Sequence, residues 1–421
     1  MKKNSKIEQA VILAAGLGLR FRPLTETKPK PLIKVLDKST LEHNLEQLDG
    51  LVGEVILVVG YLHEMIKKII GNKYKSLKIK YIFQKKPLGT ADAAKKAFSS
   101  LKEKFLLLNG DDIYDREDIK GVLRKYPSIL LAHIENSSNF GVVSHGEKFV
   151  KGIVEKPKES TRNLVNTGLY FLPKSILKFK IEKSPRGEYE FTDYINAFIK
   201  KEKLFFSVAK NWYPLPYPWY LFQAAEYVLE RDKRPNKGKI EKNCHLKGKI
   251  ITERGAIIRS GSYLEGPIYI GKNSEIGPNV FLKGPLSIGK NCKVGQAVAI
   301  KNSIIGDSSK IAHLSYVSDS VIGENCTLGA GSVLIGFRFD GTTIKTEIAG
   351  KVIDTKRKKF GAVLGDNVRA GANSLLTPGV NVGHNALLEP HSLVMENVGV
   401  NSVFYSRQNL KKVRRINKKI G

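Results

Sequence analysis

The sequence contains little of what disulfide frameworks, zinc sites and membrane spans require. Its three cysteines, Cys244, Cys292 and Cys326, lie far apart without a CxxC pair, which argues against a disulfide framework and a structural zinc site. No apolar run reaches the roughly 18 residues of a membrane-spanning helix. The polar first nine residues are also unlike a cleavable signal. We therefore expect a cytoplasmic protein that does not bind a membrane.

Acidic residues are scarce relative to basic ones. The chain has 40 Asp and Glu residues against 70 Lys and Arg residues, a formal net charge of +30. This charge favours anionic partners, such as nucleotides, sugar phosphates, coenzyme A or nucleic acid. Only residues 411–419 form a dense basic run, and no known nucleic-acid motif accompanies it. We therefore interpret most of the charge as a solvated, lysine-rich surface and expect no nucleic-acid partner.

The first half of the chain has the pattern of an α/β domain. At 421 residues the chain is too long for one compact core. Residues 1–231 alternate short apolar runs with helical segments, as in AVILAAG at 10–16 and KFLLLNGDD at 104–112. This alternation predicts a Rossmann-like, mostly parallel mixed sheet with ligands beyond the carboxyl ends of its strands. The polar residues 232–243 are predicted to be a linker.

The second half repeats with a period of six residues. A coil of three short parallel strands and three corners, stacked on the next coil, has this period. Residues 244–404 therefore resemble the left-handed β-helix of hexapeptide-repeat acyltransferases, which implies a homotrimer. We expect a loop insert at about 337–360 and a basic tail at 405–421. The periodic aliphatic positions, expected to point inward, are Ile270, Ile276, Leu282, Ile288, Val294, Ile300, Leu364, Ala370, Leu376, Val382, Leu388 and Val394.

The string LAAGLGLRFRPLTETKPKPLIKV, at residues 13–35, directly follows the first apolar run. Its small residues let backbone N–H groups approach a triphosphate, and its cations can neutralise charge that builds on phosphorus. The whole string resembles the signature of sugar-phosphate nucleotidylyltransferases. The resemblance implies that Arg20 grips the leaving pyrophosphate and that Lys30 holds the α-phosphate and the sugar phosphate. It also implies nucleotide contacts from Leu13, Ala14, Ala15, Gly16 and Gly18.

Later motifs follow in the order that this family implies. Gln84, Gly89 and Thr90 resemble the family's base-reading segment, and this resemblance favours uracil or thymine over guanine. Asp111, after an apolar strand, is the implied Mg²⁺ ligand. Where relatives carry a second metal-binding aspartate the chain has Pro214, so water, Asp112 or the nucleotide would have to substitute. The implied sugar-binding residues are Gly141, Glu155, Lys156, Asn166 and Gly168.

A second site is implied in the repeat region. Lys301 and the string His313-Leu-Ser-Tyr316 resemble the acetyltransferase half of bifunctional N-acetylglucosamine-1-phosphate uridylyltransferases, including archaeal ones, and this resemblance covers nearly the whole chain. A neutral imidazole can accept the proton of an attacking amine, so His313 is the implied general base toward acetyl-CoA. Lys301 and Tyr316 would hold the sugar phosphate. The chain departs from these relatives at Lys283, Thr327 and Gly336.

Three functions are compatible with these motifs. The first is a bifunctional enzyme that acetylates an amino-sugar-1-phosphate and couples a sugar-1-phosphate to UTP or dTTP. The second is a nucleotidylyltransferase whose β-helix is structural, and the third is a non-catalytic sensor or assembly subunit of the same fold. Pyrophosphate release separates the first two from the third, and thiol release from acetyl-CoA separates the first from the second. The sequence leaves open which sugar is used and whether UTP or dTTP is preferred.

Overall fold

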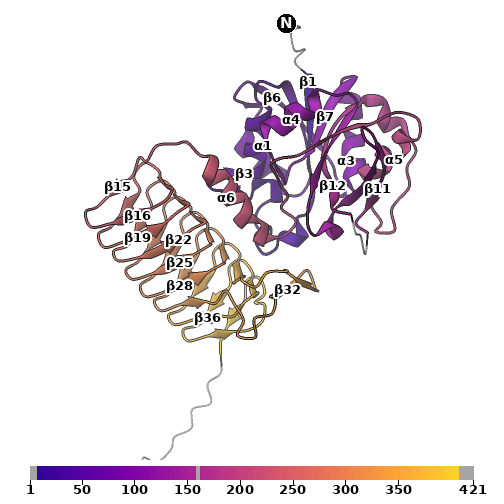
Figure 1. Cartoon of the computed structure of the whole chain (residues 1–421). Helices are drawn as coiled ribbons and strands as arrows, with labels where there is room; N and C mark the ends of the chain where they lie inside the picture. Colours follow the sequence, from indigo (N-terminus) through magenta and orange to yellow (C-terminus); the bar gives the residue numbers. More distant parts are fainter. Residues whose placement is uncertain (1–6, 158–161, 407–421) are drawn as a thin grey trace, which may run out of the picture.

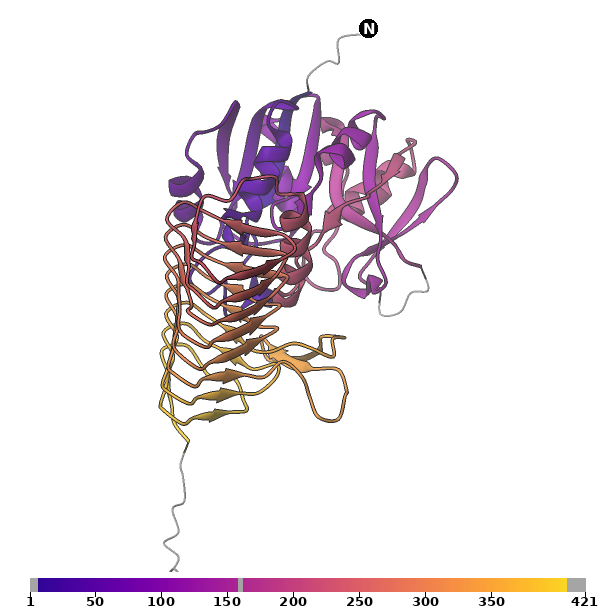
Figure 2. The same ribbon diagram turned by 60° about the vertical axis from the view of Figure 1, so that its left-hand side comes forward.

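The computed structural model describes residues 7–157 and 162–406. It consists of an α/β domain and a three-sided β-helix that lie against each other (Figures 1 and 2). The predicted basic run at 411–419 lies outside the described residues. No helix within the described ranges is long and apolar enough to cross a membrane.

A ten-stranded mixed sheet forms the centre of the α/β domain, as predicted. Its central strands are parallel, and strands from the second part of the domain join one side in antiparallel orientation. In spatial order the strands of the main path are β11 (Val150–Glu155), β10 (Gly141–His145), β12 (Leu164–Pro173), β7 (Lys104–Asn109), β1 (Ile7–Ala14), β4 (Val52–Val59), β6 (Leu77–Phe83) and β5 (Lys73–Tyr74). Off this path lie β9 (Ser128–His133), which pairs with β12, and β13 (Phe205–Val208), which pairs with β9.

Helices cover both faces of this sheet, which explains why its strands are continuously apolar. Side chains alternate along β1, so Val11 packs in one hydrophobic cluster while Ala10 and Ile12 pack in the other. The helices are α1 (Thr40–Leu48), α2 (His63–Ile70), α3 (Thr90–Lys96), α4 (Arg116–Leu123), α5 (Phe191–Ile199) and α6 (Leu221–Arg231). Short 3₁₀ helices are η1 (Leu19–Phe21), η2 (Lys30–Leu32), η3 (Phe98–Ser100), η4 (Ser137–Asn139), η5 (Lys174–Lys178) and η6 (Pro218–Tyr220). Two small sheets pair β2 (Lys34–Val35) with β3 (Lys38–Ser39), and β8 (Ile113–Tyr114) with β14 (Trp212–Tyr213).

Helix α1 carries a buried histidine that makes the stability of this domain depend on pH. His43 is 8% exposed, its Nε2–H donates to the Val35 carbonyl at 3.0 Å, and burial lowers its pKa. Below the unfolded-state pKa of about 6.5, His43 is protonated in the unfolded chain but stays neutral in the folded chain until a lower pH. We predict that unfolding free energy falls by up to about 1.4 kcal/mol per pH unit below that value, beyond the pH dependence of His43→Gln. Urea unfolding between pH 7.5 and 5 measures this difference, with the exposed His133→Gln as control; equal pH dependence in wild type and His43→Gln would contradict it.

Three parallel sheets form the sides of the β-helix, which confirms the predicted fold of the second half. The first contains β15 (Lys239–Ile240), β18 (Ile257–Ile258), β21 (Glu275–Ile276), β24 (Lys293–Val294), β27 (Lys310–Ile311), β30 (Thr327–Leu328), β35 (Arg369–Ala370), β38 (Leu387–Leu388) and β40 (Val403–Phe404). The second contains β16 (His245–Lys247), β19 (Tyr263–Glu265), β22 (Phe281–Lys283), β25 (Ala299–Lys301), β28 (Tyr316–Ser318), β31 (Val333–Leu334), β36 (Leu375–Leu376) and β39 (Leu393–Val394). The third contains β17 (Ile250–Thr252), β20 (Ile268–Ile270), β23 (Leu286–Ile288), β26 (Ile304–Ile305), β29 (Val321–Ile322), β34 (Val363–Leu364) and β37 (Asn381–Val382).

The period-six aliphatic residues predicted to point inward are all buried in one core cluster. The predicted linker, however, extends too far toward the C-terminus. Strand β15 lies inside residues 232–243 and pairs with β18, with Ile240 opposite Ile258. The reason is that Ile240 occupies one more position of the same six-residue repeat, hidden among polar neighbours. The coil therefore begins before the polar stretch ends.

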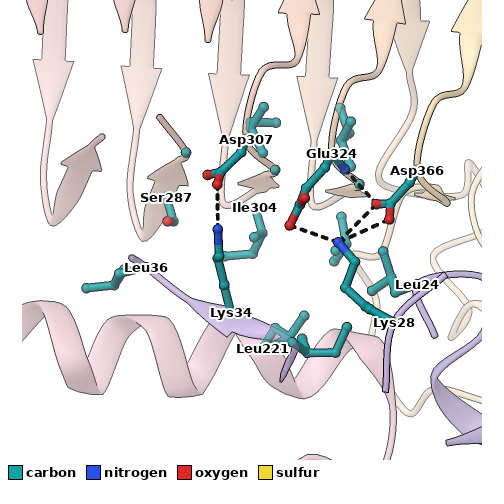
Figure 3. Close-up of a pocket in the computed structure, with 17 residues that line it drawn as sticks. Leu24, Lys28, Lys34, Leu36, Leu221, Ser287, Ile304, Asp307, Glu324 and Asp366 are labelled. Atoms are coloured by element: carbon teal, nitrogen blue, oxygen red, sulfur yellow. Dashed lines mark hydrogen bonds and ion pairs between the residues drawn. The ribbon is translucent and has the colours of Figure 1, made fainter. Parts of the chain in front are cut away.

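The segment between Arg20 and Lys30 is anchored to the β-helix by ion pairs (Figure 3). Lys28 Nζ lies 2.8 Å from Glu324 Oε1 and 3.1 Å from Asp366 Oδ2. Burial disfavours the Lys28 ammonium, but these two carboxylates outweigh it and raise the Lys28 pKa. The two domains therefore meet at the loop that carries the predicted catalytic cations.

Candidate active sites

A cavity of about 720 Å³ opens at the carboxyl ends of β1 and β7, where an α/β sheet is expected to bind ligands. It brings together every residue predicted for nucleotidyl transfer, although these come from segments up to about 150 positions apart. They are Leu13, Ala14, Ala15, Gly16, Gly18, Arg20, Lys30, Gln84, Gly89, Thr90, Asp111, Gly141, Glu155, Lys156, Asn166 and Gly168. The individual roles of these residues remain predictions.

The signature loop folds back on itself at one glycine. Gly18 has φ 67°, the left-handed region that favours glycine, and its carbonyl accepts a hydrogen bond from Thr25 Oγ1 at 2.8 Å. A Cβ at this position would lie 3.1 Å from the Thr25 side chain and 3.2 Å from that of Lys30. The turn therefore sets Lys30 close to the start of η1, which carries Arg20.

An ion pair and a neighbouring carboxyl group line the cavity. Lys30 Nζ lies 2.5 Å from Asp111 Oδ2. Desolvation opposes ionisation of Asp111, but the Lys30 ammonium outweighs it and lowers the Asp111 pKa. Burial, reinforced by the Asp111 charge, raises the pKa of Asp112. The two adjacent carboxyls thus differ in basicity, and a cation bound between them would favour ionisation of both.

The donor set fits Mg²⁺ that is shared with phosphate oxygens. No group of three or more His, Cys, Asp or Glu side chains with metal-binding geometry occurs among residues 7–157 and 162–406. Mg²⁺ commonly needs only one or two carboxylates and takes its other ligands from water and substrate phosphates. Asp111 and Asp112 can supply those two, whereas Pro214, which also lines the cavity, cannot. The Leu215 N–H donates to Asp112 Oδ1 at 3.4 Å. This hydrogen bond holds Asp112 close to Pro214, the residue that precedes Leu215.

The predicted base-reading residues line one part of the cavity. Gln84 is 4% exposed, and its Nε2 donates to Asp92 Oδ2 at 2.7 Å, so the amide orientation is fixed. Gly89 has φ 109°, and a Cβ there would lie 2.4 Å from the Tyr189 carbonyl oxygen. A side chain at position 89 would therefore clash with the backbone of Tyr189 and displace the turn that precedes α3.

The predicted sugar-binding residues line another part. Asn166 Nδ2 donates to the Tyr170 hydroxyl at 2.6 Å, and its Oδ1 accepts from the Gly168 N–H at 2.9 Å. Burial raises the pKa of Glu155 and lowers that of Lys156, and the two charged groups lie 3.6 Å apart. Hydrogen-bond donors and acceptors are therefore both available here for sugar hydroxyls.

Two cations of the cavity were not predicted. Arg186, whose Nη2 lies 2.6 Å from Glu190 Oε1, belongs to none of the motifs identified in the sequence. Lys351 comes from the insert of the β-helix, more than 300 residues after the signature loop. No local sequence signal connects these residues to the cavity.

The second predicted site lies on the surface of the β-helix. Lys301 and Tyr316 occupy neighbouring strands of one sheet, with Lys301 Nζ 5.8 Å from the centre of the Tyr316 ring. His313 is exposed at the corner before β28. Its Nδ1 accepts a hydrogen bond from the Gln296 N–H at 3.2 Å, so the neutral ring carries its proton on Nε2. For Nε2 to accept a proton from the substrate, the hydrogen bond between the Gln296 N–H and Nδ1 must therefore break.

Known protein families match both halves of the chain. Residues 9–220 match the nucleotidyl transferase family, and residues 264–375 match the GMPPB C-terminal domain family. The chain is 39% identical over 407 residues to bifunctional protein GlmU of Methanococcus maripaludis, covering 95% of this chain and 98% of that relative. It is 36% identical over 406 residues to a bifunctional sugar-1-phosphate nucleotidylyltransferase/acetyltransferase of Sulfurisphaera tokodaii, covering 94% and 99%.

A third relative covers the α/β domain alone. The UTP–glucose-1-phosphate uridylyltransferase AglF of Haloferax volcanii is 35% identical over 208 residues, which are 46% of this chain and 84% of that relative. Fold and cavity thus define a nucleotidyl transferase domain fused to a hexapeptide-repeat β-helix. The chain belongs to the archaeal GlmU-type family of bifunctional sugar-1-phosphate nucleotidylyltransferases/acetyltransferases.

Proposed function

We propose that this chain couples UTP or dTTP to a sugar-1-phosphate in the α/β domain and acetylates an amino-sugar-1-phosphate on the β-helix. The observation that carries the first activity is the cavity in which Arg20, Lys30 and Asp111 lie together with the predicted base and sugar residues. The family relationship supports the second.

Nucleotidyl transfer needs positioning and charge stabilisation more than covalent chemistry. A sugar phosphate oxygen attacks the α-phosphorus in line, a new P–O bond forms, and the bond to the β-phosphate breaks to release pyrophosphate. Lys30 would stabilise charge on the α-phosphate and Arg20 would hold the leaving pyrophosphate. The Gln84 carbonyl oxygen would accept the N3–H of uracil or thymine, because Asp92 already holds its amide nitrogen.

Asp111 and Asp112 would hold Mg²⁺, which when bound neutralises phosphate charge in such transfers. We predict that Asp111→Asn lowers kcat by about 100-fold, since metal stabilisation of the transition state contributes several kcal/mol. Because Asp112 would stand in for the carboxylate missing at Pro214, Asp112→Asn should raise the Mg²⁺ concentration needed for half-maximal rate by about tenfold. Mg²⁺ titrations of pyrophosphate release measure both effects.

The control for these titrations is Asp340→Asn, which removes an exposed carboxylate of the insert that does not line the cavity. An Mg²⁺ dependence of Asp112→Asn identical to that of Asp340→Asn would contradict the substitute role. It would leave Asp111 and the nucleotide as the Mg²⁺ ligands.

Acetyl transfer would join the amine nitrogen of the sugar to the acetyl carbon, breaking the C–S bond and releasing the coenzyme A thiol. His313 would accept the amine proton, with Lys301 and Tyr316 on the sugar phosphate. We propose a homotrimer, because the sheet of β16 to β39 presents a column of largely apolar outward side chains around this site. The column consists of His245, Tyr263, Phe281, Ala299, Tyr316, Val333, Leu375 and Leu393.

The hydrogen bond from Gln296 to His313 favours a second candidate, nucleotidyl transfer with a structural β-helix. Two assays on the wild-type protein decide. Pyrophosphate release is measured with Mg²⁺, glucosamine- or glucose-1-phosphate and each nucleoside triphosphate, and thiol release is measured with acetyl-CoA and glucosamine-1-phosphate. Release of both products supports the bifunctional enzyme, and release of pyrophosphate alone supports the second candidate. If the protein releases neither product, the result supports a non-catalytic subunit.

A further inference from the structure

The insert of the β-helix forms a hairpin that projects on the side of the α/β domain (Figures 1 and 2). Strands β32 (Lys345–Ile348) and β33 (Lys351–Asp354) pair in antiparallel register across the two-residue turn Ala349 and Gly350. Both turn residues have positive φ, 51° and 75°, as a tight hairpin turn of this type requires. The turn places Lys351 directly at the tip of the hairpin.

Hydrogen bonds fix the base of the hairpin to the β-helix. Thr346 Oγ1 donates to the Gly379 carbonyl at 2.6 Å. Asn381 Nδ2 donates to Thr346 Oγ1 and to the Glu347 carbonyl, each at 2.8 Å. The β-helix therefore holds the hairpin at its base through contacts of its own.

Apolar contacts fix the other side of the hairpin to the α/β domain. Ile344, Ile348 and Phe360 are buried in the same cluster as Phe21 of η1. The Phe360 ring lies edge-on to Trp219, with 5.3 Å between ring centres, and β32 packs against η1. Since η1 also carries Arg20, the hairpin tip and Arg20 are held by one packed unit.

Lys351 lines the nucleotidyl cavity, and no ionic partner for it occurs among residues 7–157 and 162–406. Three other cations of the cavity lie within 4 Å of a carboxylate: Lys30 with Asp111, Lys156 with Glu155, and Arg186 with Glu190. Among the described residues, no carboxylate forms an ion pair with Arg20 or Lys351. These two cations are therefore available to an anionic ligand, and a ligand with several negative charges would satisfy both.

We propose that Lys351 binds the β- and γ-phosphates of the nucleoside triphosphate beside Arg20, so that the C-terminal domain completes the N-terminal active site. The inference rests on the proposed nucleotidyl transfer. The same contact would bind pyrophosphate in the reverse reaction, because these two phosphates become pyrophosphate. It makes Lys351 a substrate-binding residue that acts on the leaving group and leaves the sugar side unchanged.

The test compares Lys351→Ala, Lys351→Glu and Lys351→Arg in the full chain. The control is Lys345→Ala, which removes another exposed lysine of the same hairpin outside the cavity. Loss of one charged contact to phosphate weakens binding by about tenfold. We expect Lys351→Ala to raise KM for the nucleotide and for pyrophosphate by about that factor, with Lys351→Glu larger and Lys351→Arg near wild type. KM for the sugar phosphate should not change.

Calorimetric Kd values for UTP, dTTP and pyrophosphate with Mg²⁺ separate this inference from the proposed function. A wild type that releases no pyrophosphate refutes the proposed function, yet a tenfold weaker nucleotide Kd in Lys351→Ala still supports the phosphate contact. Unchanged Kd and KM values in both Lys351→Ala and Lys351→Glu would overturn the inference. So would an effect confined to the sugar phosphate, and so would an equal effect in Lys345→Ala.

Discussion

Replacing Arg20 with alanine is expected to lower kcat/KM for the nucleoside triphosphate by about a thousandfold, since one preorganised charge stabiliser contributes 10²- to 10³-fold to kcat and Arg20 also binds the ground state. Arg20 has no carboxylate partner among the described residues, and its guanidinium lies 5.6 Å from the centre of the Tyr217 ring. Its charge is therefore available to an anionic ligand. Steady-state pyrophosphate release measures the effect.

A neighbouring arginine provides the matched control. Arg22 is exposed on the same loop and does not line the cavity, so Arg22→Ala should retain wild-type rates. Thiol release by Arg20→Ala should also stay at the wild-type level, because the β-helix folds around its own core. A rate loss in Arg22→Ala as large as that in Arg20→Ala would mean that the loop responds to any change of charge, and the phosphate-binding role of Arg20 would be lost.

Replacing His313 with alanine is expected to reduce thiol release from acetyl-CoA by at least about 100-fold, the lower range for loss of a general base. Without the imidazole, the attacking amine has no positioned group that accepts its proton. Pyrophosphate release should remain unchanged, since His313 lies on the β-helix outside the nucleotidyl cavity. Thiol detection with glucosamine-1-phosphate as acceptor measures the effect.

The His313 experiment has a control on the same β-helix. His391 is another exposed corner histidine, with φ 61°, and asparagine tolerates this backbone conformation. His391→Asn should therefore leave both activities intact. If His313→Ala retained wild-type thiol release, the base would be another group, and the hydrogen bond from Gln296 to His313 would be a structural corner contact.

Much of this architecture was predictable because its signals are local and periodic. The six-residue repeat stacks Ile276 between Ile258 and Val294 of the neighbouring coils. Each of these contacts depends only on residues in one coil and the next. The residues of the nucleotidyl cavity were equally predictable from the sequence, because motifs that follow parallel strands gather at the same edge of the sheet. Asp111 follows β7 and the signature loop follows β1, and these strands are neighbours.

The remaining features depend on contacts between distant segments. Lys28 in the signature loop is an ordinary lysine in the sequence, yet its ammonium group forms ion pairs with Glu324 and Asp366 of the β-helix. Lys351 reaches the cavity only because the insert packs on η1. Neither contact alters local hydrophobic periodicity or turn chemistry. The start of the β-helix was also predicted too late, because a single aliphatic residue, Ile240, marks the first coil.

The most direct test of the account is a crystal structure of the full chain with Mg²⁺ and a non-hydrolysable UTP analogue. We expect triphosphate density beside the backbone of residues 14–18, with Lys30 on the α-phosphate and Arg20 on the β- and γ-phosphates. A nucleotide bound outside this cavity, or Lys30 turned away from its phosphates, would contradict it.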